Sequence, residues 1–83
     1  MVTEPRPATA APELLAYVDD LRVDADRMDG YAQRLRGVAV TLAGRAEAPE
    51  WSGTTLERQA TACAAAAAQL RFAATALLTH ATN

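Results

Sequence analysis

The fold is decided by residues 14–46, LLAYVDDLRVDADRMDGYAQRLRGVAVTLAGRA, which carry an unbroken repeat of seven. A large apolar residue recurs every seven positions, and valine or alanine follows each of them four positions later. None of the ten positions is polar: Leu14, Val18, Leu21, Ala25, Met28, Ala32, Leu35, Ala39, Leu42 and Ala46. This spacing predicts a long amphipathic helix that packs its apolar stripe against another helix.

The same repeat returns in the second half of the chain, where a large residue and an alanine again alternate. Its members are Leu56, Ala60, Cys63, Ala67, Leu70, Ala74, Leu77 and Ala81. Pro49 lies between the two repeats, and proline both removes a backbone donor and disfavours helix at the preceding residue. Two helices joined by a short turn run antiparallel, and their leucines are expected to interdigitate.

We therefore predict an all-α, antiparallel helix-turn-helix hairpin. The expected helices cover about 12–47 and 54–80 of a hairpin domain that spans 12–83, with a turn over about 48–53 and a flexible N-terminal arm over 1–11. Asp24 could instead cap a separate second helix. Because the repeat keeps its phase across Asp24, one continuous helix is the prediction.

The size of the chain indicates that it works with a partner. A domain of 83 residues is marginal alone, and one rich in alanine buries little apolar area. Its single cysteine cannot form an internal disulfide, and one histidine with one cysteine makes no structural zinc site. A second copy or another chain is then the expected source of stability.

Several classes of function are disfavoured by composition. The net charge is −2 and the eight basic residues, all arginine, are scattered, which argues against nucleic acid as a ligand. No secretory signal peptide is visible, and the longest apolar run, Ala62–Ala68, is too short to span a membrane stably. We expect no enzyme, cofactor or metal site, because no acid, base and nucleophile converge. The aspartates between Asp19 and Asp29 lack the pattern of a calcium loop and are expected to form a solvated face.

The segment Trp51-Ser52-Gly53 falls at the predicted turn. Gly53 would allow a positive φ or a close backbone contact there, and the Trp51 ring could cover the end of the alanine-rich contact. A Trp-x-Gly turn between two helices in so short a chain resembles the WXG family of small proteins of type VII (ESX) secretion. The segment from Leu21 to Asp26 is similar to the opening of the related EspC-like group.

The resemblance implies a hairpin that pairs with a second hairpin, as a homodimer or heterodimer, into a four-helix bundle. It also implies a protein that is cytoplasmic before export and leaves the cell through type VII machinery, without a signal peptide. The family's export signal is a tyrosine followed four positions later by an acidic residue. No tyrosine follows Trp51 and no acidic residue follows Glu57, so the partner would supply the signal, or a tail is missing, or the chain is not exported.

Residues outside the repeat are candidates for the partner interface. Apolar side chains off the stripe would be exposed in a lone hairpin, and such surfaces often mark an interface. Three glycines spaced by seven could form a smooth groove for a partner helix, or reflect a solvent face. The predicted interface residues are Phe72, Leu78, Tyr31, Val38, Gly30, Gly37 and Gly44. An alternative function is a helical adaptor or targeting domain that docks in cis within a larger toxin or effector.

Overall fold

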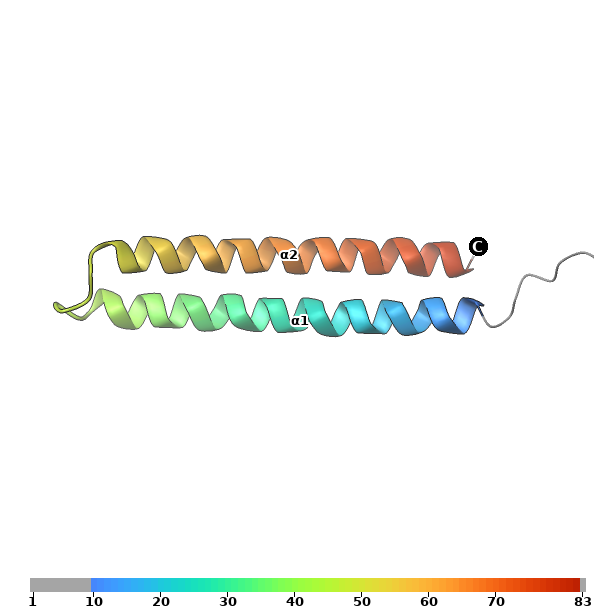
Figure 1. Cartoon of the computed structure of the whole chain (residues 1–83), viewed down its shortest axis with the longest axis horizontal. Helices are drawn as coiled ribbons and strands as arrows, with labels where there is room; N and C mark the ends of the chain where they lie inside the picture. Colours follow the sequence, from blue (N-terminus) through green and yellow to red (C-terminus); the bar gives the residue numbers. More distant parts are fainter. Residues whose placement is uncertain (1–9, 83) are drawn as a thin grey trace, which may run out of the picture.

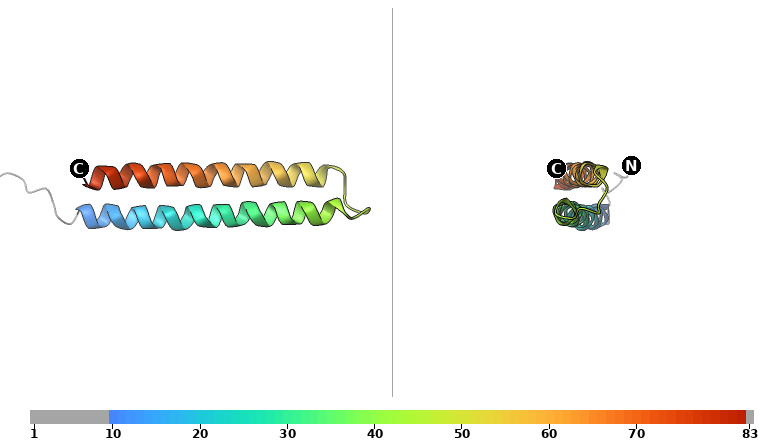
Figure 2. Two further views of the ribbon diagram at one scale, coloured as in Figure 1. Left: turned by 180° about the vertical axis from the view of Figure 1, so that it is seen from behind. Right: turned by 90° about the vertical axis from the view of Figure 1, so that its left-hand side faces the viewer.

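The computed structural model describes residues 10–82, which form two antiparallel helices. Helix α1 runs Ala10–Ala43 and α2 runs Trp51–Thr82. They lie side by side along their whole length, joined by one turn (Figures 1 and 2). The predicted all-α hairpin is confirmed. Most of the predicted N-terminal arm, residues 1–9, lies outside the described part of the chain, whereas Ala10 and Ala11 already belong to α1.

Helix α1 is continuous through Asp24, as the unchanged phase of the repeat predicts. Pro12 and Glu13 lie in its first turn. Proline is tolerated there because the first backbone N–H groups of a helix have no partner within it. The carboxylate of Glu13 is favourable beside the positive end of the helix dipole.

The turn lies earlier than predicted, over residues 44–50. Helix α1 ends at Ala43, and the N–H groups of Gly44 and Arg45 bond back three residues, to Thr41 at 3.3 Å and to Leu42 at 3.0 Å. Such bonds tighten the last turn of a helix. The chain leaves the helix at Gly44, the residue with the lowest helix propensity in this stretch. Residue Ala46, assigned to the apolar stripe, is therefore exposed in the turn.

Helix α2 begins at Trp51, three residues before the predicted start. The Ser52 N–H bonds to the Pro49 carbonyl at 3.0 Å, so Pro49 stands just ahead of the first helical turn, where proline is well suited. Trp51 and Gly53 are thus helical residues rather than turn residues. Gly53 does not have a positive φ, so the conformational freedom expected of it is not used.

Alanine forms the contact between the helices. The buried hydrophobic residues of α1 are Val18, Ala25, Ala32 and Ala39, and those of α2 are Ala60, Ala67 and Ala74. Val18 is the largest fully buried side chain of the described hairpin. Small side chains let two backbones approach closely, but each adds little apolar area to the core. The hairpin core is accordingly thin.

The large residues of the repeat are only half-buried, which corrects the expectation that they close the hairpin on itself. All nine have intermediate exposure: Leu14, Leu21, Met28, Leu35, Leu42, Leu56, Cys63, Leu70 and Leu77. They stand three or four positions from a buried residue, so they flank the line of contact instead of lying on it. Two helices alone cover such side chains from one direction, and a third element would be needed to cover the rest.

Candidate functional site

Ion pairs between the helices show which stripes share a side of the hairpin. Arg71 lies 2.7 Å from Asp29, and Arg36 lies 3.6 Å from Glu57. In both helices these residues flank the buried alanines in the direction opposite to the leucines. The hairpin therefore has a charged side, defined by Arg22, Asp29, Arg36, Glu57 and Arg71, and a leucine side, defined by the nine half-buried residues above.

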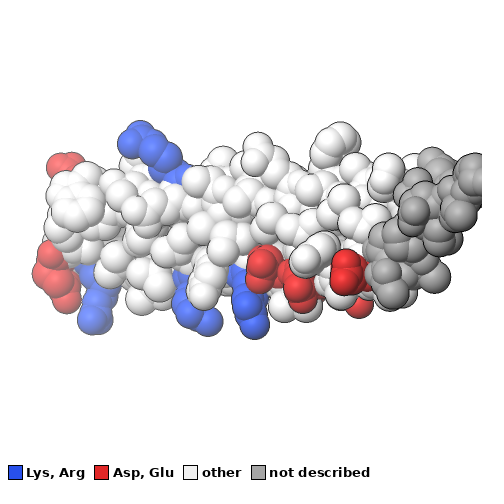
Figure 3. Space-filling view, turned by 45° about the vertical axis from the view of Figure 1, so that its right-hand side comes forward, with Lys and Arg blue, Asp and Glu red and all other residues white. Residues whose placement is uncertain are grey.

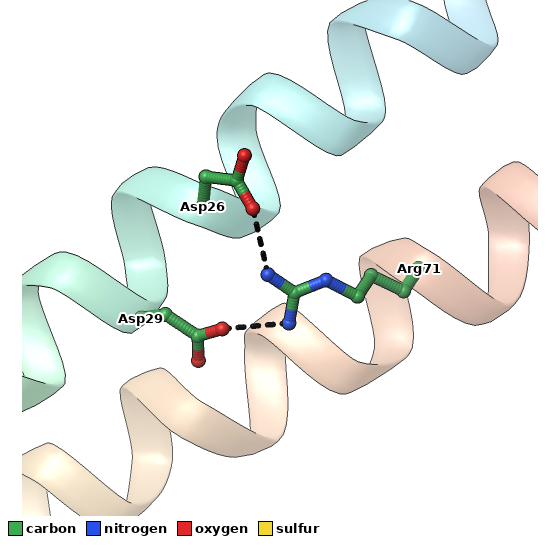
Figure 4. Close-up of polar contacts among 3 residues, drawn as sticks. All are labelled: Asp26, Asp29 and Arg71. Carbon is green, nitrogen blue, oxygen red and sulfur yellow. Dashed lines mark hydrogen bonds and ion pairs between the residues drawn. The ribbon is translucent and has the colours of Figure 1, made fainter.

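Arg71 is the centre of the charged side (Figure 4). Its guanidinium donates to Asp26 at 2.8 Å and pairs with Asp29 at 2.7 Å, and the two aspartates are one helical turn apart on α1. The hydrogen bond to Asp26, then that to Asp29, raises the pKa of Arg71 above its ordinary value. Two of the aspartates that were expected to form a solvated face, Asp26 and Asp29, thus form ion pairs with α2. The antiparallel arrangement predicted from the sequence could have shown that Arg71 lies opposite these aspartates.

The leucine side is an apolar surface to which both helices contribute. It runs along both helices, and none of its nine residues is polar or charged. On α1 it is bordered by Tyr17, Asp24, Tyr31 and Val38, which recur every seven residues and are all exposed. Of the large residues at this border, Tyr31 is 45 % exposed and Val38 is 42 % exposed. A continuous apolar surface of this kind is typical of a helix-packing interface.

The predicted interface residues do not share one surface. Tyr31 and Val38 border the leucine side. Leu78 is half-buried and stands at the seven-residue spacing of Arg71, which places it on the charged side. Phe72 is 77 % exposed. It shares the seven-residue spacing of Trp51, on the side of α2 that is directed away from α1. Only two of the four apolar residues thus lie where a single partner on the leucine side could contact them.

The glycine row is interrupted by the end of α1. Gly30 and Gly37 are exposed in the helix, and a Cβ built on either would meet nothing within 4 Å. Gly44 lies beyond the helix, in the turn, so it does not continue a groove along α1. Neither helical glycine is required by packing inside the hairpin.

Trp51 does not cover the end of the alanine contact. It is the first residue of α2 and 65 % exposed, so the expected sealing role is wrong. Ser52 is the buried residue at this position, and a shallow hollow of about 450 Å³ lies beside it between the helix ends, lined by Leu42, Arg45 and Pro49 among others. Because α2 starts earlier than predicted, Trp51 is part of the helix, and its indole lies on the side of α2 that is directed away from α1.

Within residues 10–82, no group of three or more His, Cys, Asp or Glu side chains could hold a metal ion. Cys63 is a free, half-buried thiol on the leucine side, and His80 is exposed in the last turn of α2. No enzymatic site is proposed from these residues.

One membrane-span candidate is present in the described residues. Helix α2 contains an 18-residue window with a mean hydropathy of 1.3, of which 11 % is buried. Alanine accounts for most of this hydropathy, and length and composition alone are weak evidence for insertion. The sequence-based expectation of no stable membrane insertion stays a prediction.

The comparisons with known proteins found no matching family model, no matching curated protein and no matching solved structure.

Proposed function

We propose that this chain is a non-enzymatic interaction module that packs its leucine side against a second helical hairpin to form a four-helix bundle. The observation that carries the proposal is the contrast between the two kinds of apolar residue. The buried contact is built almost entirely of alanine, while nine larger side chains on the same side of the two helices are only partly buried.

Packing energetics favour association over a lone hairpin. Complete burial of a leucine side chain contributes about 1.5–3 kcal/mol relative to full exposure, so each partly exposed leucine gains a minor part of that contribution when a partner covers it. An alanine core of two helices supplies little stability of its own. A second hairpin on the leucine side would bury these residues from the uncovered direction, at the usual spacing of a four-helix bundle.

The kind of partner system is suggested by the Trp51-Ser52-Gly53 segment between two long helices. We propose that the hairpin is a type VII secretion substrate or the dimer partner of one, cytoplasmic until it leaves the cell without a signal peptide. In this proposal the partner carries an export signal. Residues 52–83 contain neither a tyrosine nor an acidic residue beyond Glu57.

Association is tested by sedimentation velocity over a range of concentrations, alone and with co-expressed candidate hairpins. We expect Tyr31→Asp and Val38→Asp to weaken association, since both residues border the leucine side. Phe72→Asp is the matched control, because Phe72 is more exposed than either and faces away from α1. Far-UV circular dichroism checks that each variant stays helical. A wild-type chain that remains monomeric in every combination contradicts the interaction role.

Export is tested separately in a bacterium with a type VII system. We expect the chain to reach the culture filtrate when it is co-expressed with its bundle partner, and to stay in the cell when Tyr31→Asp prevents pairing. Export of the unpaired chain at the same level would contradict the proposed dependence on a partner. Loss of export in a strain without the type VII ATPase is the control for the route.

A further inference from the structure

The side of α1 that is directed away from α2 carries a hollow between two arginines. The hollow has a volume of about 250 Å³ and is lined by Arg27, Gly30, Tyr31 and Arg34. Arg27, Gly30 and Arg34 each stand two positions from a buried alanine, which places them about 200° around the helix from the contact with α2. A hairpin packed on the leucine side would approach only the Tyr31 edge of this arginine hollow and would leave the rest of it open.

Gly30 leaves the α1 backbone uncovered in the middle of the arginine hollow. No atom lies within 4 Å of a Cβ built on Gly30, so packing inside the hairpin does not require a glycine here. Glycine in the middle of a helix is destabilising relative to alanine. A ligand that approaches the backbone between the two guanidinium groups would account for a glycine at this position.

The guanidinium of Arg34 is held beside the hollow by an aromatic ring. Its central carbon stands 5.8 Å from the centre of the Tyr31 ring, within the range of a cation–π contact. Arg34 forms no ion pair within residues 10–82. Its donors therefore remain available to an anion from outside the chain.

Arg27, on the other side of the hollow, is only loosely engaged. Its guanidinium lies 3.4 Å from the Asp24 carboxylate, and the two side chains are 67 % and 53 % exposed. Such exposed pairs contribute little, so a more highly charged anion can displace the carboxylate. Arg27 and Arg34 are seven residues apart, about 10 Å along the helix axis, a separation that two long side chains can close around one group.

A phosphate group suits two converging guanidinium groups better than a carboxylate does. A phosphorylated side chain carries about two negative charges at neutral pH and three acceptor oxygens, so both guanidinium groups can bind it at once. A single bidentate arginine already satisfies the two oxygens of a carboxylate and would leave the second arginine unused.

The charges along α1 favour an isolated phosphate over an extended polyanion. Residues 10–26 contain five acidic residues and one arginine, and residues 27–43 contain three arginines and one aspartate. On the face in Figure 3, the acidic side chains along the lower edge give way to basic ones toward the turn. Asp20 stands on the same seven-residue stripe as both arginines, with Asp24 beside it. A nucleic-acid strand or an anionic membrane that covers the hollow would also meet these carboxylates.

The openness of the hollow favours a phosphate that is carried by a protein. Pockets for small molecules usually enclose most of the surface of their ligand, which a hollow on the outside of one helix does not. A partner protein can add contacts to α1 around the hollow. A short phosphorylated side chain keeps the partner's backbone close enough for those contacts, whereas the longer phosphotyrosine would hold it away.

We propose that the arginine hollow binds a phosphorylated serine or threonine side chain of another protein, with Arg27 and Arg34 on either side of the phosphate. This inference goes beyond the interaction role proposed above and does not depend on it.

Binding is tested by an NMR titration of the isotope-labelled protein in a buffer without phosphate. The probe is a pentapeptide with one phosphoserine between glycines. We expect it to shift the backbone N–H signals of residues 27–34 in a saturable way, and inorganic phosphate to shift the same signals. The peptide with glutamate in place of phosphoserine should have a dissociation constant about tenfold higher or more, and the unphosphorylated peptide should cause no shift.

Two variants separate the charge of the site from its shape. Arg27→Gln with Arg34→Gln should raise the dissociation constant of the phosphopeptide about tenfold or more, with Arg58→Gln on α2 as the control. Gly30→Leu fills the hollow while both arginines stay, and we expect a loss of similar size. Gly37→Leu is the matched control, because Gly37 is equally exposed on the same stripe and does not line the hollow.

Several results would overturn the site. These are a phosphopeptide that shifts no signal of residues 27–34, or an affinity that neither the double glutamine variant nor Gly30→Leu lowers relative to its control. Equal affinity for the glutamate peptide refutes a phosphate ligand. Sedimentation with vesicles of equal parts phosphatidylcholine and phosphatidic acid, lost in the double variant, would assign the site to a lipid headgroup and refute a protein source.

The two proposals fail separately. The double glutamine variant and Gly30→Leu should leave association with a hairpin partner unchanged, because the arginine hollow is directed away from α2 and the leucine side is intact. A chain that binds a hairpin but not the phosphopeptide refutes this inference alone. A chain that binds the phosphopeptide but no hairpin refutes the four-helix bundle alone.

Discussion

Arg71 of α2 reaches across the hairpin to Asp26 of α1, 2.8 Å away, and joins two residues separated by 45 positions in the chain. The alanine contact beside this pair repeats every seven residues and distinguishes one register from the next only weakly. The pair, together with that to Asp29, favours a single register of α2 along α1.

Removing this pair tests its contribution to the hairpin. We expect Arg71→Met to lower the melting temperature slightly, because both partners are solvent-exposed and exposed pairs contribute little. Arg58→Met is the control, since Arg58 forms no ion pair within residues 10–82. The raised pKa of Arg71 means that its stabilisation is complete below the unfolded pKa and is lost only as the pH rises through the folded one. Thermal unfolding across neutral pH should therefore show no change from deprotonation of Arg71.

Enlarging the alanine contact tests how closely the helices pack. Ala67 has no exposed surface, so Ala67→Leu must push α1 and α2 apart or distort them. We expect a loss of about 1–3 kcal/mol in the free energy of unfolding, measured by urea denaturation. Ala65→Leu, on the exposed stripe of the same helix, should be neutral within about 0.5 kcal/mol. Equal effects at the two positions would contradict the alanine contact.

Trp51 offers a test of the exposed indole. Because the ring is 65 % exposed, Trp51→Ala should change the free energy of unfolding by less than about 0.5 kcal/mol. A buried ring would have cost about 3–5 kcal/mol. The fluorescence of this single tryptophan should be quenched readily by acrylamide, to the same extent at low and high protein concentration, since its stripe lies away from the leucine side. Protection on association would place Trp51 in the interface.

The two helical glycines can be replaced to separate folding from association. Gly30→Ala and Gly37→Ala add a methyl group into open space and remove a poor helix former, so each should stabilise the hairpin by about 0.5–1 kcal/mol in thermal unfolding. Gly37→Ala should leave self-association unchanged. Weaker association with Gly37→Ala would instead support the glycine groove expected from the sequence.

The repeat of seven was sufficient to predict the hairpin, because its phase survives Asp24 and resumes after Pro49. The turn was placed late because Pro49 is the stronger local signal, whereas the helix already ends at Gly44 through backbone bonds that composition does not reveal. That shift carries Trp51 out of the turn and onto an exposed stripe.

The candidate interface was predicted only in part, for a geometric reason. Sequence spacing identifies which residues share a stripe, but it does not say on which side of a contact a stripe lies. The pairs that Arg71 and Arg36 make across the hairpin supply that information, and they separate Tyr31 and Val38 from Phe72 and Leu78. The leucines are only partly buried because two helices cover them from one direction.

The alanine contact has a consequence for how such a protein can change in length. Each group of seven residues brings the same small buried side chain and the same leucine edge, so an added heptad in α1 matched by one in α2 would extend the hairpin by about 10 Å and preserve both sides. An insertion in one helix alone would instead displace Arg71 from Asp26 and Asp29. Natural length variants should accordingly differ by paired multiples of seven residues.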